Sequence, residues 1–137
     1  MTDFVEVTDR VWVARYAWAD VNVTAIGGER GLVVVDTHGS TVAGRIVLDD
    51  LRRLGVGPVT SVVNTHWHWD HTFGNAAFRE AAHDVPIHAH EETARWLAEH
   101  GLLPKQYFPT TSMILIARKR WRRRLLFQIG YSSTHTR

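Results

Sequence analysis

The sequence predicts an α/β fold, and three observations lead to this prediction. Residues 31–38 and 59–66 are continuous runs rich in β-branched side chains, as expected of strands that are buried on both faces. Between them, Ser40 or Thr41 can cap a helix whose apolar residues recur at helical spacing, namely Val42, Ile46, Leu48, Leu51 and Leu54. A strand, a helix and a second strand in this order indicate a crossover connection and a layered arrangement.

The remaining segments extend this pattern on both sides. Residues 10–16 and 21–28 alternate apolar and polar side chains as strands do, and their short connections to 31–38 favour an antiparallel meander. After the second buried run, residues 75–82 predict a short helix and residues 86–90 a strand. Residues 91–101 predict a further helix that ends at a glycine.

The composition narrows the class of protein. A chain of 137 residues with 45% hydrophobic and 22% charged side chains suits a single globular domain. There is no cysteine, so disulfides and thiolate metal sites are excluded, and any metal must be held by nitrogen and oxygen. The N-terminal residues lack the pattern of a signal peptide, and no apolar stretch is long enough to cross a bilayer. We therefore expect a cytoplasmic location and no membrane partner.

The segment NTHWHWDHTFGN, residues 64–75, holds four candidate metal ligands, His66, His68, Asp70 and His71. On an extended segment, side chains two apart point the same way, so the first two imidazoles can face one ion. Asp70 and His71 follow where the chain must turn, and they could serve a second, neighbouring ion. This nitrogen and oxygen set suits zinc, with iron or manganese as alternatives. A two-metal site lowers the pKa of a bound water, and an aspartate there can orient that water or take up its proton.

The pattern H-x-H-x-D-H at residues 66–71 resembles the signature of the metallo-β-lactamase superfamily. The likeness extends back through GLVVVDTH and VTSVVNTHWHWDH and forward through TFGN and PIHAHEET, over roughly residues 8–110. The resemblance implies a four-layer αββα sandwich that usually holds zinc, two ions in a complete site. It implies that His66 and His68 ligate the first metal and that Asp70 and His71 ligate the second. Asp70 would be the catalytic residue that positions the bridging hydroxide.

The function implied by this resemblance is that of a metal-dependent hydrolase. Metal-bound hydroxide would attack an ester, thioester, lactam or related small-molecule substrate, and lactones and phosphodiesters are also substrates in the family. Some members instead bind iron and carry out redox chemistry, so the family does not fix the substrate.

A complete member of that family needs more ligands than these four. It has a third histidine for the first metal and, later, a bridging aspartate and a last histidine. The last two belong to a C-terminal half that this sequence does not contain, so the fold expected is the N-terminal part of the sandwich, apparently truncated. His135 is the one candidate for the third histidine, and its place two residues from the end of the sequence argues against it. A catalytically inactive, truncated fragment is therefore the first alternative function. Its uncovered sheet face would favour pairing with another copy or aggregation.

Several other polar and aromatic residues near the cluster have more than one interpretation. Asp36 either hydrogen-bonds a metal ligand from behind or caps the end of a strand, and His38 is a turn histidine more readily than a ligand. Trp67 and Trp69 are expected to pack as walls, although either could flank a pocket. Four further histidines are expected to be surface or structural residues, namely His83, His88, His90 and His100.

The charge distribution divides the chain. Seven of the 16 basic residues and none of the 14 acidic residues lie in residues 112–137, so the high isoelectric point belongs to this segment. We predict a metallo-β-lactamase-like domain at 1–111 and a basic, atypical tail at 112–137. The tail could be an arm for nucleic acid or anionic membrane, a poorly packed end, or a segment translated out of register, and we favour the last. A basic-tailed nucleic-acid-binding module is thus the second alternative, although a nucleic-acid partner is not expected for the domain itself.

Overall fold

A computed structural model describes residues 2–82 and 84–100, in two compact units that we treat separately. The first unit spans Met1–His90 and contains the sheet and the candidate site. The second spans Glu91–Arg137, and its described part is the helix α4 (Glu91–His100). The division expected between 1–111 and 112–137 falls outside the described residues and stays a prediction.

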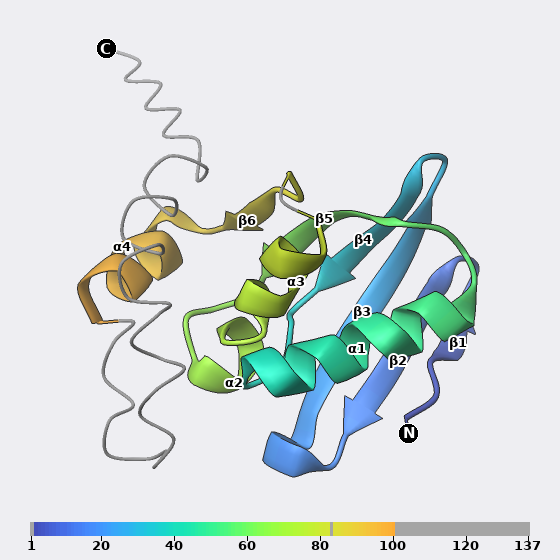
Figure 1. Cartoon of the computed structure of the whole chain (residues 1–137), viewed down its shortest axis with the longest axis horizontal. Helices are drawn as coiled ribbons and strands as arrows, with labels where there is room; N and C mark the ends of the chain where they lie inside the picture. Colours follow the sequence, from blue (N-terminus) through green and yellow to red (C-terminus); the bar gives the residue numbers. More distant parts are fainter. Residues whose placement is uncertain (1, 83, 101–137) are drawn as a thin grey trace. The chain divides into compact units, whose positions relative to one another are not determined.

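Six strands form a single sheet in the described part of the first unit, and they lie side by side in chain order (Figure 1). They are β1 (Val5–Thr8), β2 (Val11–Tyr16), β3 (Val21–Gly28), β4 (Gly31–Val35), β5 (Val59–Asn64) and β6 (Ile87–Ala89). The first four run antiparallel, which confirms the meander, whereas β4, β5 and β6 run parallel. Parallel neighbours require crossover connections, and helices supply them.

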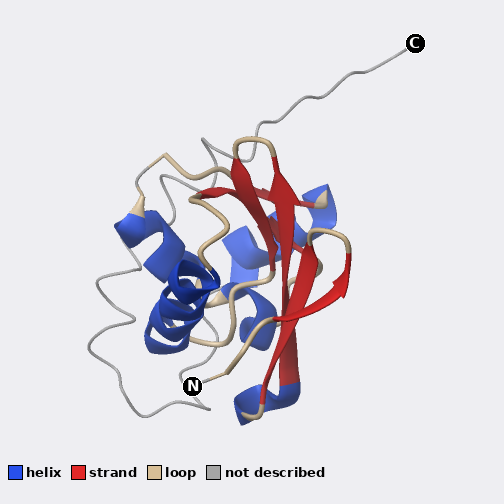
Figure 2. Cartoon of the chain, turned by 90° about the vertical axis from the view of Figure 1, so that its right-hand side faces the viewer, coloured by secondary structure: helices blue, strands red, loops and turns tan. Residues whose placement is uncertain are grey.

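The crossover helices confirm the α/β class. Helix α1 (Thr41–Leu54) connects β4 to β5, while α2 (Trp69–Thr72) and α3 (Asn75–Ala81) connect β5 to β6. A short 3-10 helix, η1 (Trp18–Asp20), closes the turn between β2 and β3. Figures 1 and 2 show α1 and α3 on the same face of the sheet.

The core of the first unit lies between that sheet face and the two helices. Helix α1 contributes Val47, Leu48 and Leu51, and α3 contributes Ala77 and Phe78. They pack on strand residues that are nearly all below 2% exposed, including Ala14, Val21, Val23, Ala25, Leu32, Val34 and Val62. Burial of this apolar surface is the main stabilising contribution, at about 25 cal/mol per Å².

Helix α1 begins and ends where the sequence predicts, but its buried face includes only part of the predicted apolar face. The Ser40 hydroxyl accepts a hydrogen bond from the backbone N–H of Ala43 at 3.1 Å, and Gly55 ends the helix with a φ of 72°. Of the predicted apolar face, Leu48 and Leu51 are buried, whereas Val42 and Ile46 are 57% and 48% exposed. At these turns the helix buries the next residue in the chain instead, Ala43 after Val42 and Val47 after Ile46. Successive helical residues point about 100° apart around the helix axis, so only one of each pair can face the sheet.

Two further differences concern the strands. Strand β1 was not predicted, because every residue of this edge strand is exposed and its sequence lacks a buried face. Strands β4 and β5 end at Val35 and Asn64, earlier than the expected 38 and 66. Asp36 and His38 adopt positive φ values of 65° and 73°, which no strand accommodates. The chain therefore leaves the sheet just before the residues of the candidate site.

The described part of the second unit is consistent with the helix predicted at 91–101. Its first turn carries Glu91 and Glu92, and Glu92 pairs with Arg95 three residues on. Thr93 and Leu97, one turn apart, are its buried residues. Among the described residues of either unit, no helix combines the length and apolar character needed to cross a bilayer.

Candidate metal centre

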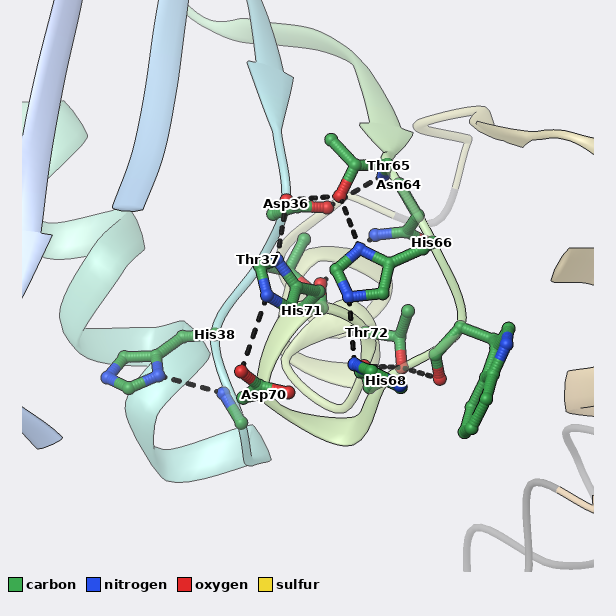
Figure 3. A network of polar contacts seen from close by, with 12 residues as sticks. Asp36, Thr37, His38, Asn64, Thr65, His66, His68, Asp70, His71 and Thr72 are labelled. Atoms are coloured by element: carbon green, nitrogen blue, oxygen red, sulfur yellow. Dashed lines mark hydrogen bonds and ion pairs between the residues drawn. The ribbon is translucent and has the colours of Figure 1, made fainter. Parts of the chain in front are cut away.

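The candidate site lies at the carboxyl ends of β4 and β5. These strands are parallel neighbours, with Val35 opposite Val63, so the residues that follow them leave the sheet at one edge. Residues 36–38 follow β4, and residues 65–68 follow β5 and lead into α2. This edge is where α/β sheets usually carry their ligand sites. All four predicted ligands are found here (Figure 3).

His66 and His68 face each other, as their spacing predicts. The Nε2 atom of His66 lies 3.0 Å from the Nδ1 atom of His68, and the ring centroids are 4.5 Å apart. His66 is half-buried and His68 is exposed, so the pair is open to solvent on one side. The segment is a bend rather than a strand, but it places the two imidazoles together.

Asp70 and His71 form a second pair on α2. The Nε2 atom of His71 lies 3.3 Å from Oδ2 of Asp70, and the His71 ring centroid lies 4.1 Å from that of His66. The sequence predicts a turn here, and the structure has a single helical turn that begins after His68. The Thr72 hydroxyl donates to the His68 carbonyl at 3.0 Å and so fixes the start of that turn. The two pairs therefore make one cluster.

Asp36 is in direct contact with this cluster and also accepts hydrogen bonds from Thr65 after β5, so it makes the contacts expected of both roles that the sequence leaves open. Its side chain is buried, and Oδ2 lies 2.7 Å from Nδ1 of His71. The same carboxylate accepts hydrogen bonds from the backbone N–H and the hydroxyl of Thr65, at 2.9 and 2.8 Å. Both ring nitrogens of His71 thus face a carboxylate, and the contact of Nδ1 with Asp36 is the shorter one. The tautomer with its proton on Nδ1 would leave Nε2 as the nitrogen that can bind a metal ion.

A buried polar network beneath the cluster was missed by the sequence reasoning. Thr37 donates its hydroxyl hydrogen to Asn75 Oδ1 at 2.7 Å, and Asn75 Nδ2 donates to Asn64 Oδ1 at 2.6 Å. The carbonyl of His71 then accepts from Asn64 Nδ2 and from the Thr37 backbone N–H, at 3.2 and 3.0 Å. The two asparagines are the first and last residues of the motif segment, and this position was the only hint in the sequence that they belong to the site. The network ties α2 and α3 to both strand ends.

His38 lies apart from the other three histidines. Figure 3 shows its ring on the far side of Asp70, away from His66 and His71. It is buried, its Nδ1 accepts a hydrogen bond from the Gly39 N–H at 2.9 Å, and it packs on the rings of Tyr16 and Trp18. The pKa of His38 is lowered by burial, an effect that the Asp70 charge opposes.

The tryptophans of the motif pack against neighbouring rings, as predicted. The Trp67 ring meets the His68 ring edge-on, with centroids 4.3 Å apart, and the Trp69 ring lies 5.7 Å from that of Trp18. The surface positions predicted for His88 and His90 are confirmed. The predictions for His83 and His135 and for the side chain of His100 lie outside the described residues.

The surroundings of His66 favour its neutral form. The pKa of His66 is lowered, first by its partial burial and then by the neighbouring His71 and His68. Neutral imidazole is the form that binds a metal ion, so a lowered pKa extends metal binding to more acidic solutions. The donor set is entirely nitrogen and oxygen, which fits zinc.

Each pair of side chains in the cluster has fewer donors than a catalytic zinc ion requires. A catalytic zinc takes three protein ligands, and each pair in the cluster supplies two. Over residues 2–82 and 84–100, no group of three or more histidine, aspartate or glutamate side chains is arranged to hold a metal ion as it stands. The cluster therefore offers two partial donor sets.

The family is established by comparison with known proteins. The model of the metallo-beta-lactamase superfamily matches residues 16–132, most of the chain. The chain therefore belongs to this superfamily of metallo-hydrolases. The match runs beyond residue 110, where the likeness seen in the sequence ends. No curated protein matches the chain.

Solved structures show the same fold. A metallo-beta-lactamase from Hirschia baltica has a TM-score of 0.63 at 22% identity, over 73% of this chain and 48% of its own. The metallo-beta-lactamase FIM-1 from Pseudomonas aeruginosa, in a mono-zinc form, has a TM-score of 0.61 at 20% identity, and the match covers 73% of this chain and 46% of FIM-1. A metallo-beta-lactamase from Pontibacter korlensis has a TM-score of 0.61 at 23% identity, and the match covers 74% of this chain and 49% of that protein. This chain thus spans about half the length of the structures it resembles, as expected of a truncated sandwich.

Proposed function

We propose that the chain carries part of the metal centre of a zinc-dependent hydrolase, in which His66 and His68 hold one ion and Asp70 and His71 hold another. The pairing of donors is the observation that supports this most directly. The facing atoms are 3.0 Å apart in the first pair and 3.3 Å in the second. Two donors on one tetrahedral zinc ion, each about 2.1 Å from it, are separated by about 3.4 Å.

The surrounding residues prepare these donors for a metal. The contact of Asp36 with His71 Nδ1 would hold the ring proton on that nitrogen when Nε2, the atom beside Asp70, binds a metal ion. The Thr65 hydroxyl, which donates to Asp36, lies 2.9 Å from His66 Nδ1 and can in turn orient that ring. Such outer partners fix the tautomer and the orientation of a metal-binding histidine.

The chemistry proposed is hydrolysis of an ester, thioester, lactam or related small molecule. A bound metal supplies a nucleophile at neutral pH and polarises the bond under attack. Asp70 is the residue of the pair that can accept a proton, because its carboxylate has a second oxygen besides the one that faces His71. Membership of a superfamily of metallo-hydrolases supports the reaction class and leaves the substrate open.

One observation favours a second candidate, a metal-binding fragment without catalytic activity. Each pair has only two donors, whereas catalytic zinc takes three protein ligands. Two donors hold a metal weakly and leave its position poorly defined. The nucleic-acid-binding alternative depends on residues 112–137, which lie outside the described part of the chain.

Metal analysis with matched variants tests the proposal. If the chain is an active enzyme with a complete two-metal site, about two zinc ions per chain should remain after zinc loading and exhaustive dialysis, whereas the inactive fragment should retain fewer. His66→Ala and Asp70→Ala should each reduce the bound zinc, whereas His88→Ala, at an exposed position on β6, should not.

Hydrolysis assays on thioester and lactam substrates separate the two candidates. If the chain is a hydrolase, it should turn over one of these substrates, and Asp70→Ala should abolish the turnover. If it is an inactive fragment, it should bind zinc weakly and show no turnover. Zinc binding that is unchanged in both His66→Ala and Asp70→Ala would contradict the site.

A further inference from the structure

We infer that the cavity between η1 and the first turns of α1 binds a small neutral ligand with an apolar body and a hydrogen-bond acceptor, and that His38 is its donor. The cavity has a volume of about 390 Å³, within the range of small-molecule sites. Its wall includes Tyr16, Trp18, His38, Val42 and Ile46. Taking the occupant to be the non-reacting part of the hydrolase substrate rests on the proposed function.

The tautomer of His38 makes it a donor toward the cavity. The backbone N–H of Gly39 donates to Nδ1, so that nitrogen carries no proton and the proton of the neutral ring is on Nε2. Nε2 is at the end of the ring away from Gly39 (Figure 3). Among the described residues, no hydrogen bond is made by Nε2, and the atom is not sealed from solvent. A ligand in the cavity can therefore accept from it.

The apolar side of the cavity gives a reason why α1 exposes Val42 and Ile46, two residues of its predicted apolar face. Val42 and Ile46 are 57% and 48% exposed, and Trp18, from the turn opposite, is 48% exposed. Single exposed apolar residues are ordinary, but these three border one cavity. They give an apolar surface to a ligand without contributing to the sheet core.

The cavity adjoins the candidate metal centre. Trp18 packs on Trp69, which directly precedes Asp70 in α2. Gly39 is so close to this segment that an added Cβ would lie 2.5 Å from the Trp69 ring and 3.3 Å from the Asp70 Cα. A ligand held against Trp18 and His38 therefore lies beside the segment that carries Asp70, as the far end of a substrate would.

Two probes of matched shape test the donor. Acetophenone has an aromatic ring and a carbonyl acceptor, and ethylbenzene has the same outline without the acceptor. In protein-observed NMR titrations, we expect acetophenone to bind saturably and to shift the resonances of the His38 ring. Ethylbenzene should bind roughly three- to tenfold more weakly, because it lacks the one hydrogen bond that acetophenone accepts. His38→Phe should bring acetophenone down to the affinity of ethylbenzene.

A second variant covers the case in which His38→Phe does not fold. Val42→Trp, at an exposed helix position, should fill the cavity and weaken both probes, whereas Val7→Trp on β1 should weaken neither. Equal affinity for the two probes, or binding unaffected by Val42→Trp, would overturn the inference. The titrations use zinc-free protein, so their outcome is independent of zinc binding and hydrolysis, which test the proposed function separately.

Discussion

Asp36 is the residue at which the sheet and the candidate metal centre meet. Its carboxylate accepts from Thr65, which follows β5, and contacts His71 on α2. The left-handed backbone that Asp36 adopts is one that aspartate tolerates better than most residues. One buried side chain thus joins two strand ends and a metal-capable histidine.

Replacing this carboxylate should weaken metal binding more than folding. In Asp36→Asn the shape is kept, but the charge that faces His71 Nδ1 is lost, and we expect zinc affinity to fall about 10–100-fold. Competition with a chromophoric chelator measures it. Asp49→Asn, which removes an exposed ion pair with Arg52, is the control and should bind zinc normally. An equal affinity in the two variants would show that Asp36 does not support His71.

The four predicted ligands could be found from sequence because they lie within six residues of one another. Residues two apart on an extended segment point the same way, and the bend that the structure has here still keeps His66 and His68 together. The roles of Asp36, Asn64 and Asn75 could not be predicted, because they depend on contacts between segments far apart in the chain. Buried polar groups of this kind are recognised only when their partners are known.

At the scale of elements, the position of α2 and α3 depends on the close approach of Gly74 to the chain after β4. An added Cβ at Gly74 would lie 1.7 Å from the Thr37 carbonyl oxygen, closer than any real contact. The Gly74 N–H also donates to the His38 carbonyl at 2.8 Å. Glycine is required here for proximity rather than for backbone conformation.

Gly74→Ala should therefore disturb both stability and the site. The helices must move away from Thr37, so we expect a loss of about 1–3 kcal/mol in the free energy of unfolding. Zinc affinity should fall as well, because the His71 carbonyl accepts from the Thr37 N–H. Urea denaturation measures the first effect. Gly28→Ala, where the nearest atom is 3.4 Å away, should be close to neutral, and an equally stable Gly74→Ala protein would refute the argument.

The elements differ in how well the sequence predicts them. Helix α1 is bounded by a serine cap and a glycine stop, which act locally, so its ends were found. Which face it buries depends on the sheet and on the cavity beside it, so the assignment of Val42 and Ile46 failed. Strand β1 alternates apolar and polar residues, but it has only four residues, too few for the pattern to stand out, and all of them are exposed.

At the scale of the whole molecule, the sheet carries apolar residues on both faces. One face packs under α1 and α3. On the other, the strand register places Val5 opposite Val13, Val11 opposite Ile26, and Ile26 opposite Val33. Val5 and Ile26 are 62% and 39% exposed, so this face leaves apolar surface to be covered.

We expect the chain to associate with a second copy through this face. Sedimentation velocity should show a concentration-dependent increase in mass, because burial of exposed apolar area favours association at about 25 cal/mol per Å². Substituting lysine for Val5 and Ile26, 62% and 39% exposed, should restore a monomer. The matched pair Val42→Lys and Val56→Lys lies off this face and should not. A chain that stays monomeric at high concentration would contradict the expectation.

The central claim is that His66 and His68 form one metal-binding pair and that Asp70 and His71 form another. Anomalous diffraction at the zinc edge from zinc-loaded crystals tests it most directly. The account predicts a peak about 2.0–2.2 Å from His66 Nε2 and His68 Nδ1, and a second at the same range from Asp70 and His71 Nε2. Zinc bound elsewhere, with these four side chains free of metal, would contradict it.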